Sequence, residues 1–379
     1  MLASVLLDAC LNVGIDFFTG VPDSFLSGLC DELFLRFGTD GPSHTVAHNE
    51  GGAIGLCAGH YLATGRPALC YMQNSGLGNA VNPIASLMDR KVYSLPCLLV
   101  VGWRGEPGTK DEPQHITQGA VTLPQLDLLS VPYIILSPDT SDEDFLKAFS
   151  GLKEVLSQGR IAAVVVRKGA LKSSGRPDYA NSFSMTREKA AEVILEHLPA
   201  SDIVVSTTGK LSREIFEIRE RTSCGHEKDF LTVGSMGHAS MIALQIAREK
   251  PDRRVWCLDG DGAMLMHLGS LPVIARAGVS NLIHVVIDNG AHETVGGMPV
   301  CSGSLSPAKL ALAAGYSRAL ECDSPETLSS RLQALLSGPS AGPSLLVVHC
   351  ACGARADLGR PTTTPIQNRD AFMAFLKNP

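Results

Sequence analysis

The chain has 379 residues, of which 45% are hydrophobic, 18% are charged and only 5% are aromatic. This length predicts two or three domains and is ample for real hydrophobic cores. The net charge of −6 and the scattered lysines and arginines exclude a basic surface for nucleic acid or a polybasic membrane patch. No apolar stretch approaches the roughly 18 residues that a membrane span needs. We therefore expect no nucleic-acid partner and no membrane partner.

The first residues and the cysteines indicate a cytoplasmic protein. Residues 1–14 are apolar, but they lack a basic leader and include Asp8 and Asn12, so they predict an amphipathic helix and not a signal peptide. The 11 cysteines lie mostly in apolar runs. No CxxC pair occurs among them, so reduced, buried thiols are expected.

Short apolar runs alternate with amphipathic segments along the whole chain. In chain order, the first series predicts strands at 15–21, 43–48, 67–72, 96–103, 132–137 and 161–167, with helices at 23–37, 50–64 and 141–159. The second predicts strands at 202–208, 229–234, 254–260, 281–289 and 343–350, with helices at 187–198, 237–250, 268–278 and 324–338. Continuous apolar strands separated by helices are typical of parallel sheets with both faces covered.

A polar segment with glycine and proline and no periodicity separates the two series, at residues 171–184, and we interpret it as a linker. The sequence therefore predicts two doubly wound α/β domains, at residues 1–170 and 185–379. In such sheets, ligands bind beyond the carboxyl ends of the strands. The unusual polar and glycine-rich segments fall there, which favours an enzyme or at least a ligand-binding protein.

Two of these segments predict a magnesium site. Gly260-Asp261-Gly262 ends one predicted strand, and Asp288-Asn289 ends the next. A carboxylate, a side-chain amide and free backbone carbonyls are hard oxygen ligands that suit Mg²⁺. The helix expected to open at Ala263 would direct its N–H groups at a phosphate. An ordinary glycine turn explains the first segment alone, whereas the pair favours a site.

These residues resemble the thiamine-diphosphate-dependent enzymes, whose signature is such a GDG segment followed by an Asn-containing turn. Gly234-Ser235-Met236-Gly237 resembles the segment in which an apolar side chain, here Met236, wedges the cofactor into its bent form. His48-Asn49-Glu50 resembles the segment whose glutamate contacts the pyrimidine and activates the cofactor. The resemblance implies that Asp261, Asn289 and a backbone carbonyl near Ala291 hold Mg²⁺. It implies cofactor contacts from Glu50, Thr207, Thr208, Gly234, Ser235, Met236, Gly260, Asp261, Gly262, Ala263 and Asn289.

A closer resemblance runs through both domains. The segments TGVPDSF (19–25), GWRGEPGTKDEPQHITQG (102–119), LTVGSMGHAS (231–240) and DNGAHETVGG (288–297) are similar to the phosphonopyruvate decarboxylase family. The resemblance implies a pyrimidine-binding domain, then a diphosphate-binding domain, with no central third domain. It implies thiamine-diphosphate- and Mg²⁺-dependent decarboxylation of 3-phosphonopyruvate to phosphonoacetaldehyde and CO₂, in phosphonate biosynthesis. It also implies a homodimer or higher homo-oligomer with active sites between subunits.

An anionic 2-oxo acid of this kind needs cations and hydrogen-bond donors. Candidates for substrate binding are Ser24, Arg104, Lys110, Gln118, Lys210 and Arg213. Each charge taken alone is equally compatible with a solvated surface. Asp23, Ser24 and His115 are candidates for proton transfer, although Asp23 also suits a helix N-cap.

Three alternatives stay open at this point. Sulfopyruvate decarboxylase would keep the mechanism, but its two domains are usually separate chains. A carboligase such as acetolactate synthase is disfavoured because a central domain is missing. A non-catalytic thiamine-diphosphate-binding protein is disfavoured because Glu50, Asp261 and Asn289 are all present.

Overall fold

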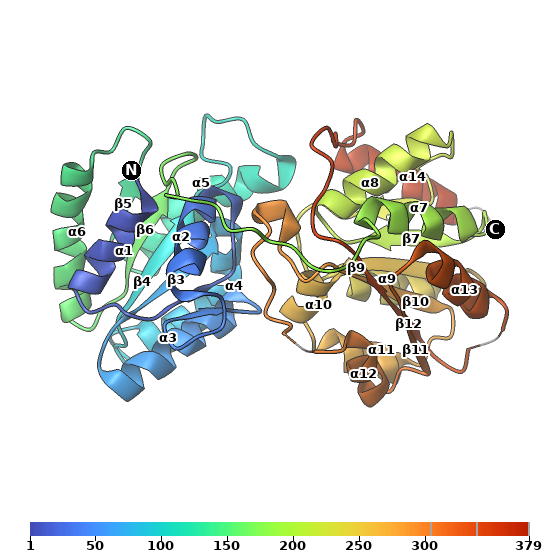
Figure 1. The fold of residues 1–379 in the computed structure, drawn as a ribbon, viewed down its shortest axis with the longest axis horizontal. Coiled ribbons are helices and arrows are strands. Elements are labelled where there is room, and N and C mark those ends of the chain that lie inside the picture. Colours follow the sequence, from blue (N-terminus) through green and yellow to red (C-terminus); the bar gives the residue numbers. More distant parts are fainter. Residues whose placement is uncertain (304, 339, 378–379) are drawn as a thin grey trace. The chain divides into compact units, whose positions relative to one another are not determined.

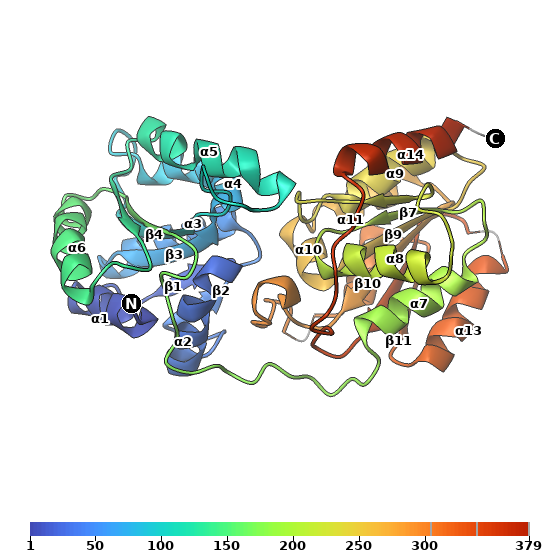
Figure 2. The same ribbon diagram turned by 90° about the horizontal axis from the view of Figure 1, so that it is seen from above.

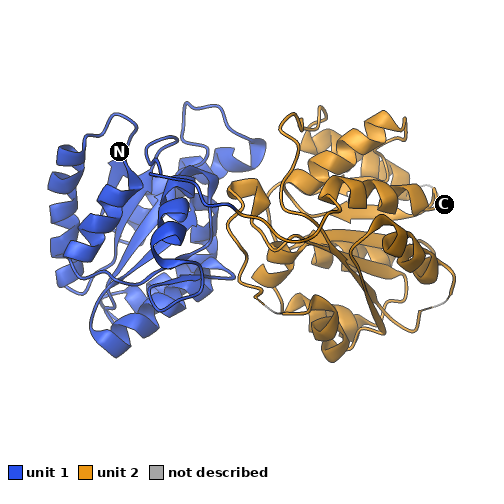
Figure 3. Cartoon of the chain, viewed as in Figure 1, with its two compact units in different colours: residues 1–178 blue, residues 179–379 orange. Residues whose placement is uncertain are grey.

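The computed structural model describes residues 1–303, 305–338 and 340–377. It divides into two compact units, residues 1–178 and 179–379, and the division lies inside the segment interpreted as a linker (Figure 3). Each unit is an α/β domain built on one six-stranded sheet. Among the described residues, no helix is long and apolar enough to cross a membrane.

Unit 1 contains a parallel sheet of order β2-β1-β3-β4-β6-β5. The strands are β1 (Phe18–Gly20), β2 (His44–Val46), β3 (Ala68–Gln73), β4 (Cys97–Gly102), β5 (Tyr133–Leu136) and β6 (Ala162–Val166). The helices are α1 (Ala3–Asn12), α2 (Ser27–Phe37), α3 (Glu50–Thr64), α4 (Leu77–Pro83), α5 (Pro113–Leu128) and α6 (Asp142–Ser157). Helices α3, α4 and α5 cover one face of the sheet, and α1, α2 and α6 cover the other (Figure 2).

The central strands are apolar because both of their faces are covered. In β3 and β4, every residue except the last of β3, Gln73, is buried. Full burial of a Val, Leu or Ile side chain contributes about 1.5–3 kcal/mol, so these runs account for much of the stability of the unit. In β3 and β4, the partly exposed polar residue lies at a strand end. The site described below is formed by residues at the ends of strands.

Unit 2 repeats the design with a parallel sheet of order β11-β12-β10-β9-β7-β8 (Figure 1). The strands are β7 (Ile203–Ser206), β8 (Asp229–Leu231), β9 (Val255–Gly260), β10 (Leu282–Asp288), β11 (Arg318–Cys322) and β12 (Ser344–His349). The helices are α7 (Arg187–His197), α8 (Lys210–Arg221), α9 (Ala239–Glu249), α10 (Asp261–Met266), α11 (Ser270–Ala277), α12 (Pro307–Ala314), α13 (Pro325–Leu336) and α14 (Pro365–Lys377). One apolar cluster joins the sheet to α7, α8 and α13, and another joins it to α9, α11, α12 and α14.

The predicted fold class is confirmed. Strand β11 and helix α5 were not among the elements predicted from the sequence, and their local sequences explain why. The edge strand β11 is only partly buried and carries Arg318 and Glu321, so it lacks the apolar run of the other strands. Helix α5 contains Pro124 and several polar residues, which hide its periodicity. Helix α10 begins at Asp261, two residues before the predicted start at Ala263. All 11 cysteines are free, but Cys224 and Cys301 are exposed, contrary to the expectation of buried thiols.

Candidate active site

The two turns that suggested a metal site lie side by side in unit 2. Strands β9 and β10 are paired in register, with Ile287 opposite Gly260, so the residues that follow them meet at one edge. Asp261 and Asn289 are each only 5% exposed. The Gly290 N–H donates to Asp261 Oδ2 at 2.9 Å, which joins the two turns directly. The third predicted ligand residue, Ala291, donates its N–H to Asn289 Oδ1 at 3.1 Å.

The donor set of these turns fits a hard divalent cation. Burial and the neighbouring Asp288 carboxylate hold the pKa of Asp261 well above its ordinary value. Burial would also raise the pKa of Asp288, but the hydrogen bonds with His349 and Asp261 and the charge of His349 together outweigh it, so the pKa is lowered. His349 Nδ1 lies 3.2 Å from Asp288 Oδ2. Two neighbouring carboxylates and an amide oxygen in a buried place are the ligands that Mg²⁺ prefers, and a cation would relieve their repulsion.

The predicted cofactor residues lie at the same edge of this sheet. Thr207 follows β7, and its N–H donates to Leu258 O at 2.8 Å. Thr208 Oγ1 accepts from the Gly234 N–H at 3.0 Å, which ties the β7 and β8 loops together. Ser235 has φ +47°, a left-handed conformation that is uncommon for residues other than glycine. This sharp turn puts Met236, which is half-buried, on the loop after β8.

The two glycines of the GDG segment have different roles. A Cβ at Gly262 would lie 3.1 Å from Val300 Cγ1 and 3.3 Å from His292 Cε1, so a larger residue would push on the loop that covers α10. A Cβ at Gly260 would meet only Thr207 Cγ2, at an ordinary 4.0 Å. The close approach therefore favours glycine at position 262, and Ala263 beside it is buried.

Two supports of the β10 loop were missed by sequence reasoning. Asn181 Nδ2 donates to Asn289 O and to Cys350 O, both at 2.9 Å, from the segment predicted as a linker. Glu293 Oε2 accepts from the Gly353 N–H at 2.7 Å, and its Oε1 lies 3.2 Å from Lys210 Nζ. Polar residues in a glycine-rich loop gave no signal that could identify these partners.

Lys210 and Arg213 begin helix α8 beside these loops. Lys210 is paired with Glu293 and is not an isolated cation. Arg213 is half-buried in the first turn of α8. Both residues lie at the predicted edge of the sheet, and their role toward a substrate stays a prediction.

In unit 1, Glu50 is the first residue of α3. Asn49 caps this helix, because its Oδ1 accepts from the Gly52 N–H at 2.8 Å. Glu50 is 5% exposed, and its Oε2 accepts from Asn79 Nδ2 at 2.8 Å. A Cβ at Gly76 would collide with the Glu50 carboxylate, so the glycine allows the loop after β3 to approach it. Glu50 is thus a buried carboxylate with a defined orientation.

Asp23 is a helix N-cap, whereas its role in proton transfer stays a prediction. Its Oδ2 accepts from the Phe25 N–H at 3.0 Å, so it caps the short 3₁₀ turn Ser24–Leu26. Its Oδ1 accepts from Gln73 Nε2 at 2.5 Å. Burial raises the pKa of Asp23, and the bonds from Gln73 and Phe25 oppose this only in part. The carboxyl group is therefore both a cap and a group that favours keeping its proton.

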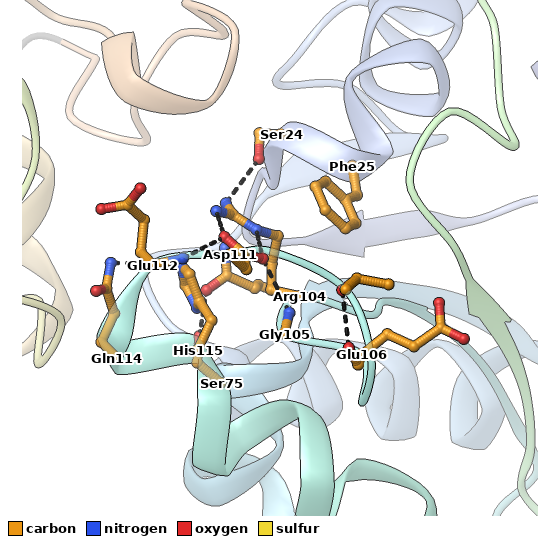
Figure 4. A network of polar contacts seen from close by, with 12 residues as sticks. Ser24, Phe25, Ser75, Arg104, Gly105, Glu106, Asp111, Glu112, Gln114 and His115 are labelled. Carbon is orange, nitrogen blue, oxygen red and sulfur yellow. Dashed lines mark hydrogen bonds and ion pairs between the residues drawn. The ribbon is translucent and has the colours of Figure 1, made fainter. Parts of the chain in front are cut away.

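Arg104 is held in a network that Figure 4 shows from close by. Its Nε and Nη2 donate to the two oxygens of Asp111, at 2.8 and 2.5 Å, and its Nη1 donates to Ser24 Oγ at 3.1 Å. The guanidinium also lies over the Phe25 ring, 4.9 Å from its centre. Burial would raise the pKa of Asp111, but Arg104 and two backbone N–H groups hold it well below its usual range.

The backbone of Arg104 is fixed as well. Asn74 Nδ2 donates to Arg104 O at 2.8 Å, and Asn74 Oδ1 accepts from the Arg104 N–H at 3.2 Å. Asn74 also bonds to Thr122 in α5. Asp111 and Asn74 are orienting residues that the sequence did not single out, although both lie in quoted motifs of the β3 and β4 loops.

His115 lies near Arg104 at the start of α5 (Figure 4). Burial, and then the charge of Arg104, lower the pKa of His115 to about 4. Its Nδ1 is buried and has no hydrogen-bond partner among the described residues. Lys110 is exposed in the loop, and Gln118 is half-buried further along α5. At neutral pH the buried histidine is therefore uncharged.

Comparison with known proteins agrees with this description. Residues 1–130 match the N-terminal TPP binding domain of thiamine pyrophosphate enzymes, and residues 208–348 match the C-terminal TPP binding domain. The chain carries both cofactor-binding domains of these enzymes, one in each unit.

Among curated proteins, the phosphonopyruvate decarboxylase of Streptomyces viridochromogenes is 34% identical, over 100% of this chain and 95% of the relative. That of Streptomyces hygroscopicus is also 34% identical, over 100% and 94%. The sulfopyruvate decarboxylase of Methanosarcina acetivorans is 28% identical, over 77% and 76%. The two-domain architecture without a central third domain therefore extends over nearly the full length of these Streptomyces relatives. The chain belongs to the phosphonopyruvate decarboxylase family of thiamine-pyrophosphate-dependent enzymes.

Proposed function

We propose that this protein decarboxylates 3-phosphonopyruvate to phosphonoacetaldehyde and CO₂, with thiamine diphosphate and Mg²⁺, in phosphonate biosynthesis. The observation that carries the metal-dependent part is the Gly290 N–H bond to Asp261, which joins the GDG turn to the Asn289 turn. The substrate is supported by 34% identity over the full chain to two phosphonopyruvate decarboxylases.

The residues of unit 2 would bind the cofactor and its metal. Asp261, Asn289 and the backbone carbonyl of Ala291 would hold Mg²⁺. The diphosphate and thiazolium parts would meet residues at the carboxyl ends of β7, β8 and β9, namely Thr207, Thr208, Gly234, Ser235, Met236, Gly260, Gly262 and Ala263. When bound, thiamine diphosphate supplies the electron sink into which the electrons of the departing CO₂ pass.

The residues of unit 1 would hold protons and orient the substrate. Glu50, buried and bonded to Asn79, would share a proton with the pyrimidine nitrogen. Such acid–base assistance typically contributes about 10²–10⁴-fold to the rate. Asp23, whose pKa is raised, would supply a proton, and the neutral His115 would accept or relay one.

Each unit carries candidate groups for binding the substrate anion. We assign Ser24, Arg104, Gln118 and Lys110 in unit 1, and Lys210 and Arg213 in unit 2. Arg104 is the strongest of these, because Asp111 fixes the plane of its guanidinium and a planar fork suits a phosphonate. We also expect a homodimer or larger homo-oligomer with active sites between subunits, which sedimentation of the purified protein would test.

Sulfopyruvate is the second candidate substrate. The Methanosarcina acetivorans sulfopyruvate decarboxylase matches 77% of this chain, which is more than either unit alone. Because that relative is a single chain, the presence of both domains in one chain does not exclude sulfopyruvate decarboxylase activity here. Its lower identity and coverage disfavour it. A carboligase and a non-catalytic cofactor-binding protein are less well supported, because the full-length relatives are named decarboxylases.

The deciding experiment measures CO₂ release from phosphonopyruvate and sulfopyruvate side by side, with and without thiamine diphosphate and Mg²⁺. We expect cofactor-dependent turnover of phosphonopyruvate alone. Glu50→Gln should bind the cofactor but lose turnover, whereas Glu32→Gln, a matched change at another buried glutamate of unit 1, should stay active. Preference for sulfopyruvate would overturn the assignment of phosphonopyruvate as the substrate. Absence of turnover with both compounds would overturn the assignment of decarboxylase activity.

A further inference from the structure

A buried row of three polar side chains lies directly behind the GDG turn. Asp259 and His284 are fully buried, and Tyr316 is 4% exposed. His284 Nε2 lies 3.3 Å from Asp259 Oδ2, and His284 Nδ1 lies 3.3 Å from the Tyr316 hydroxyl. Asp259 Oδ1 in turn accepts from the Gly260 N–H at 2.9 Å. The row Tyr316–His284–Asp259 thus ends on the first residue of the turn.

This row stands in an otherwise apolar environment. His284 is in the middle of the central strand β10, where its register partner is Cys257 and its strand neighbours Ile283 and Val285 are buried. A buried polar group costs stability unless it is hydrogen-bonded, and here both ring nitrogens have partners. Burial raises the pKa of the Tyr316 phenol, so the hydroxyl keeps its proton. A valine at position 284 would contribute to packing alone. We therefore infer that the polar side chains of this row do more than fill space.

A second metal centre would be the alternative explanation of this cluster. The ligand atoms of Cys257, Asp259 and His284 all lie within 4.8 Å of one another. However, both oxygens of Asp259 already accept hydrogen bonds, one from Gly260 and one from His284. Burial raises the pKa of Cys257 well above its ordinary value, which disfavours the thiolate that a metal needs. Asp259 and His284 are instead explained by their hydrogen bonds to each other, to Gly260 and to Tyr316.

The consequence lies at Gly260. A carboxylate only accepts hydrogen bonds, so His284 Nε2 must be the donor to Asp259, and this bond fixes the rotation of the carboxylate. With that rotation fixed, Oδ1 is aimed at the Gly260 N–H, and the Asp259–Gly260 peptide, one residue before Asp261, is held in one orientation. Groups behind metal ligands commonly tune affinity in this way.

We propose that Tyr316, His284 and Asp259 are positioning residues that fix the Gly260 peptide, so that Asp261 is presented to Mg²⁺ in one orientation. The proposal rests on the proposed function, because it takes Asp261 as a ligand of the metal. The row acts on Asp261 through the backbone, and none of its three side chains needs to touch the metal or the substrate.

The test compares two buried Tyr–His hydrogen bonds. Tyr316→Phe removes the outer bond of the row and keeps the ring. Tyr71→Phe is the matched control, because the Tyr71 hydroxyl lies 2.9 Å from His44 Nε2 and both residues are fully buried in unit 1. Two quantities are measured on the full chain: the Mg²⁺ dissociation constant with thiamine diphosphate present, by titration calorimetry, and hydrogen–deuterium exchange at Gly260 without ligands.

We expect Tyr316→Phe to weaken Mg²⁺ binding by about fivefold, the factor that one buried hydrogen bond typically contributes. His284→Asn should weaken it by about 10- to 100-fold, as is usual for groups behind a metal ligand. Both variants should speed exchange at Gly260. Tyr71→Phe should leave both quantities unchanged, although it lowers the free energy of unfolding.

Three outcomes would overturn the proposal. Unchanged Mg²⁺ affinity and unchanged Gly260 exchange in Tyr316→Phe would reduce the row to a structural role. An effect of equal size in Tyr71→Phe would mean that general loosening is the cause. Stoichiometric zinc in the purified protein that is lost in Cys257→Ser would mean that the cluster is a metal centre. If the unaltered protein fails to bind Mg²⁺, the proposed function fails, whereas Gly260 exchange still tests the row.

Discussion

Asp111 holds the guanidinium of Arg104 through two hydrogen bonds, from Nε at 2.8 Å and from Nη2 at 2.5 Å. The two residues are seven positions apart in the same loop, so the loop carries its own counter-charge. A cation that a substrate anion would meet is therefore already neutralised and oriented. The anion would therefore compete with Ser24 for Nη1 of Arg104, which now donates to Ser24 Oγ.

Asp111→Asn should release this orientation. The variant leaves a partly buried guanidinium without its charged partner, so we expect the free energy of unfolding to fall by about 1–3 kcal/mol. We also expect the KM for the substrate to rise more than kcat falls, because Arg104 would no longer be held in place. Denaturant unfolding and steady-state kinetics measure the two effects. Asp8→Asn, which breaks the exposed pair with Arg36, is the control and should change stability by less than about 1 kcal/mol. An unchanged KM in Asp111→Asn would argue against Arg104 as the anchor of the substrate.

His115 should give the protein a pH-dependent stability. Burial and Arg104 lower its folded pKa to about 4, below the ordinary 6.5, so between these values the unfolded chain binds more protons. Stability should therefore fall as the pH falls from about 6.5 to about 4, by up to about 3 kcal/mol from this group. His115→Gln should lose that part of the slope in a series of unfolding curves. His238→Gln, at an exposed histidine, should keep it. An identical slope in both variants would show that other groups cause it.

Asn181→Ala should weaken binding of the metal and the cofactor. The side chain joins Asn289 O to Cys350 O, so its loss would free the loop that carries a predicted metal ligand. We expect Mg²⁺ affinity to fall by about 10-fold or more. The matched control is Asn281→Ala, because Asn281 Nδ2 donates to three backbone carbonyls at the opposite end of β10. Calorimetric titration should separate the two, with a loss of stability in both and a loss of affinity only in Asn181→Ala.

Mg²⁺ with thiamine diphosphate should stabilise the fold through Asp261. Ligand at about 100 times its dissociation constant adds about 2.7 kcal/mol, which thermal melting would detect as a higher Tm. Chelation of the metal should remove the gain, and Asp261→Asn should be insensitive to the metal. Asp202→Asn changes a buried carboxylate that is bonded to Trp256 instead, and it should retain the metal response. A metal-dependent Tm in Asp261→Asn would exclude Asp261 as a main ligand.

The parallel sheets and the clustering of polar loops were predictable because both follow from local patterns. Apolar runs such as residues 161–167 are typical of strands covered on both faces, and the carboxyl ends of such strands meet at one edge. The meeting of Asp261 with the Asn289 turn followed from this rule, and the structure bears it out. The assignment of these residues to Mg²⁺ stays a prediction.

Partners that depend on side-chain packing could not be predicted. Nothing in the sequence distinguishes Asp111, which pairs with Arg104, from Glu106, which pairs with Arg167, or from the exposed Lys110 nearby. Lys210 is predicted from the sequence to bind the substrate, but its pairing with Glu293 could not be predicted because it depends on how a distant loop folds back. His284 sits inside an apolar strand, where a single polar residue is easily taken for an exception to the pattern.

The two hydrogen bonds of Asn181 also determine where this chain can be divided. Sulfopyruvate decarboxylase relatives include separate alpha and beta subunits, so two-chain forms exist among related enzymes. A second fragment that begins at residue 185, just after the predicted linker, would lack Asn181 and therefore the hydrogen bond that holds the Asn289 loop. A fragment that begins at residue 179 would keep this hydrogen bond. Residues 179–184 of the linker are thus part of the second unit, and a two-chain version of this protein should be split before residue 179.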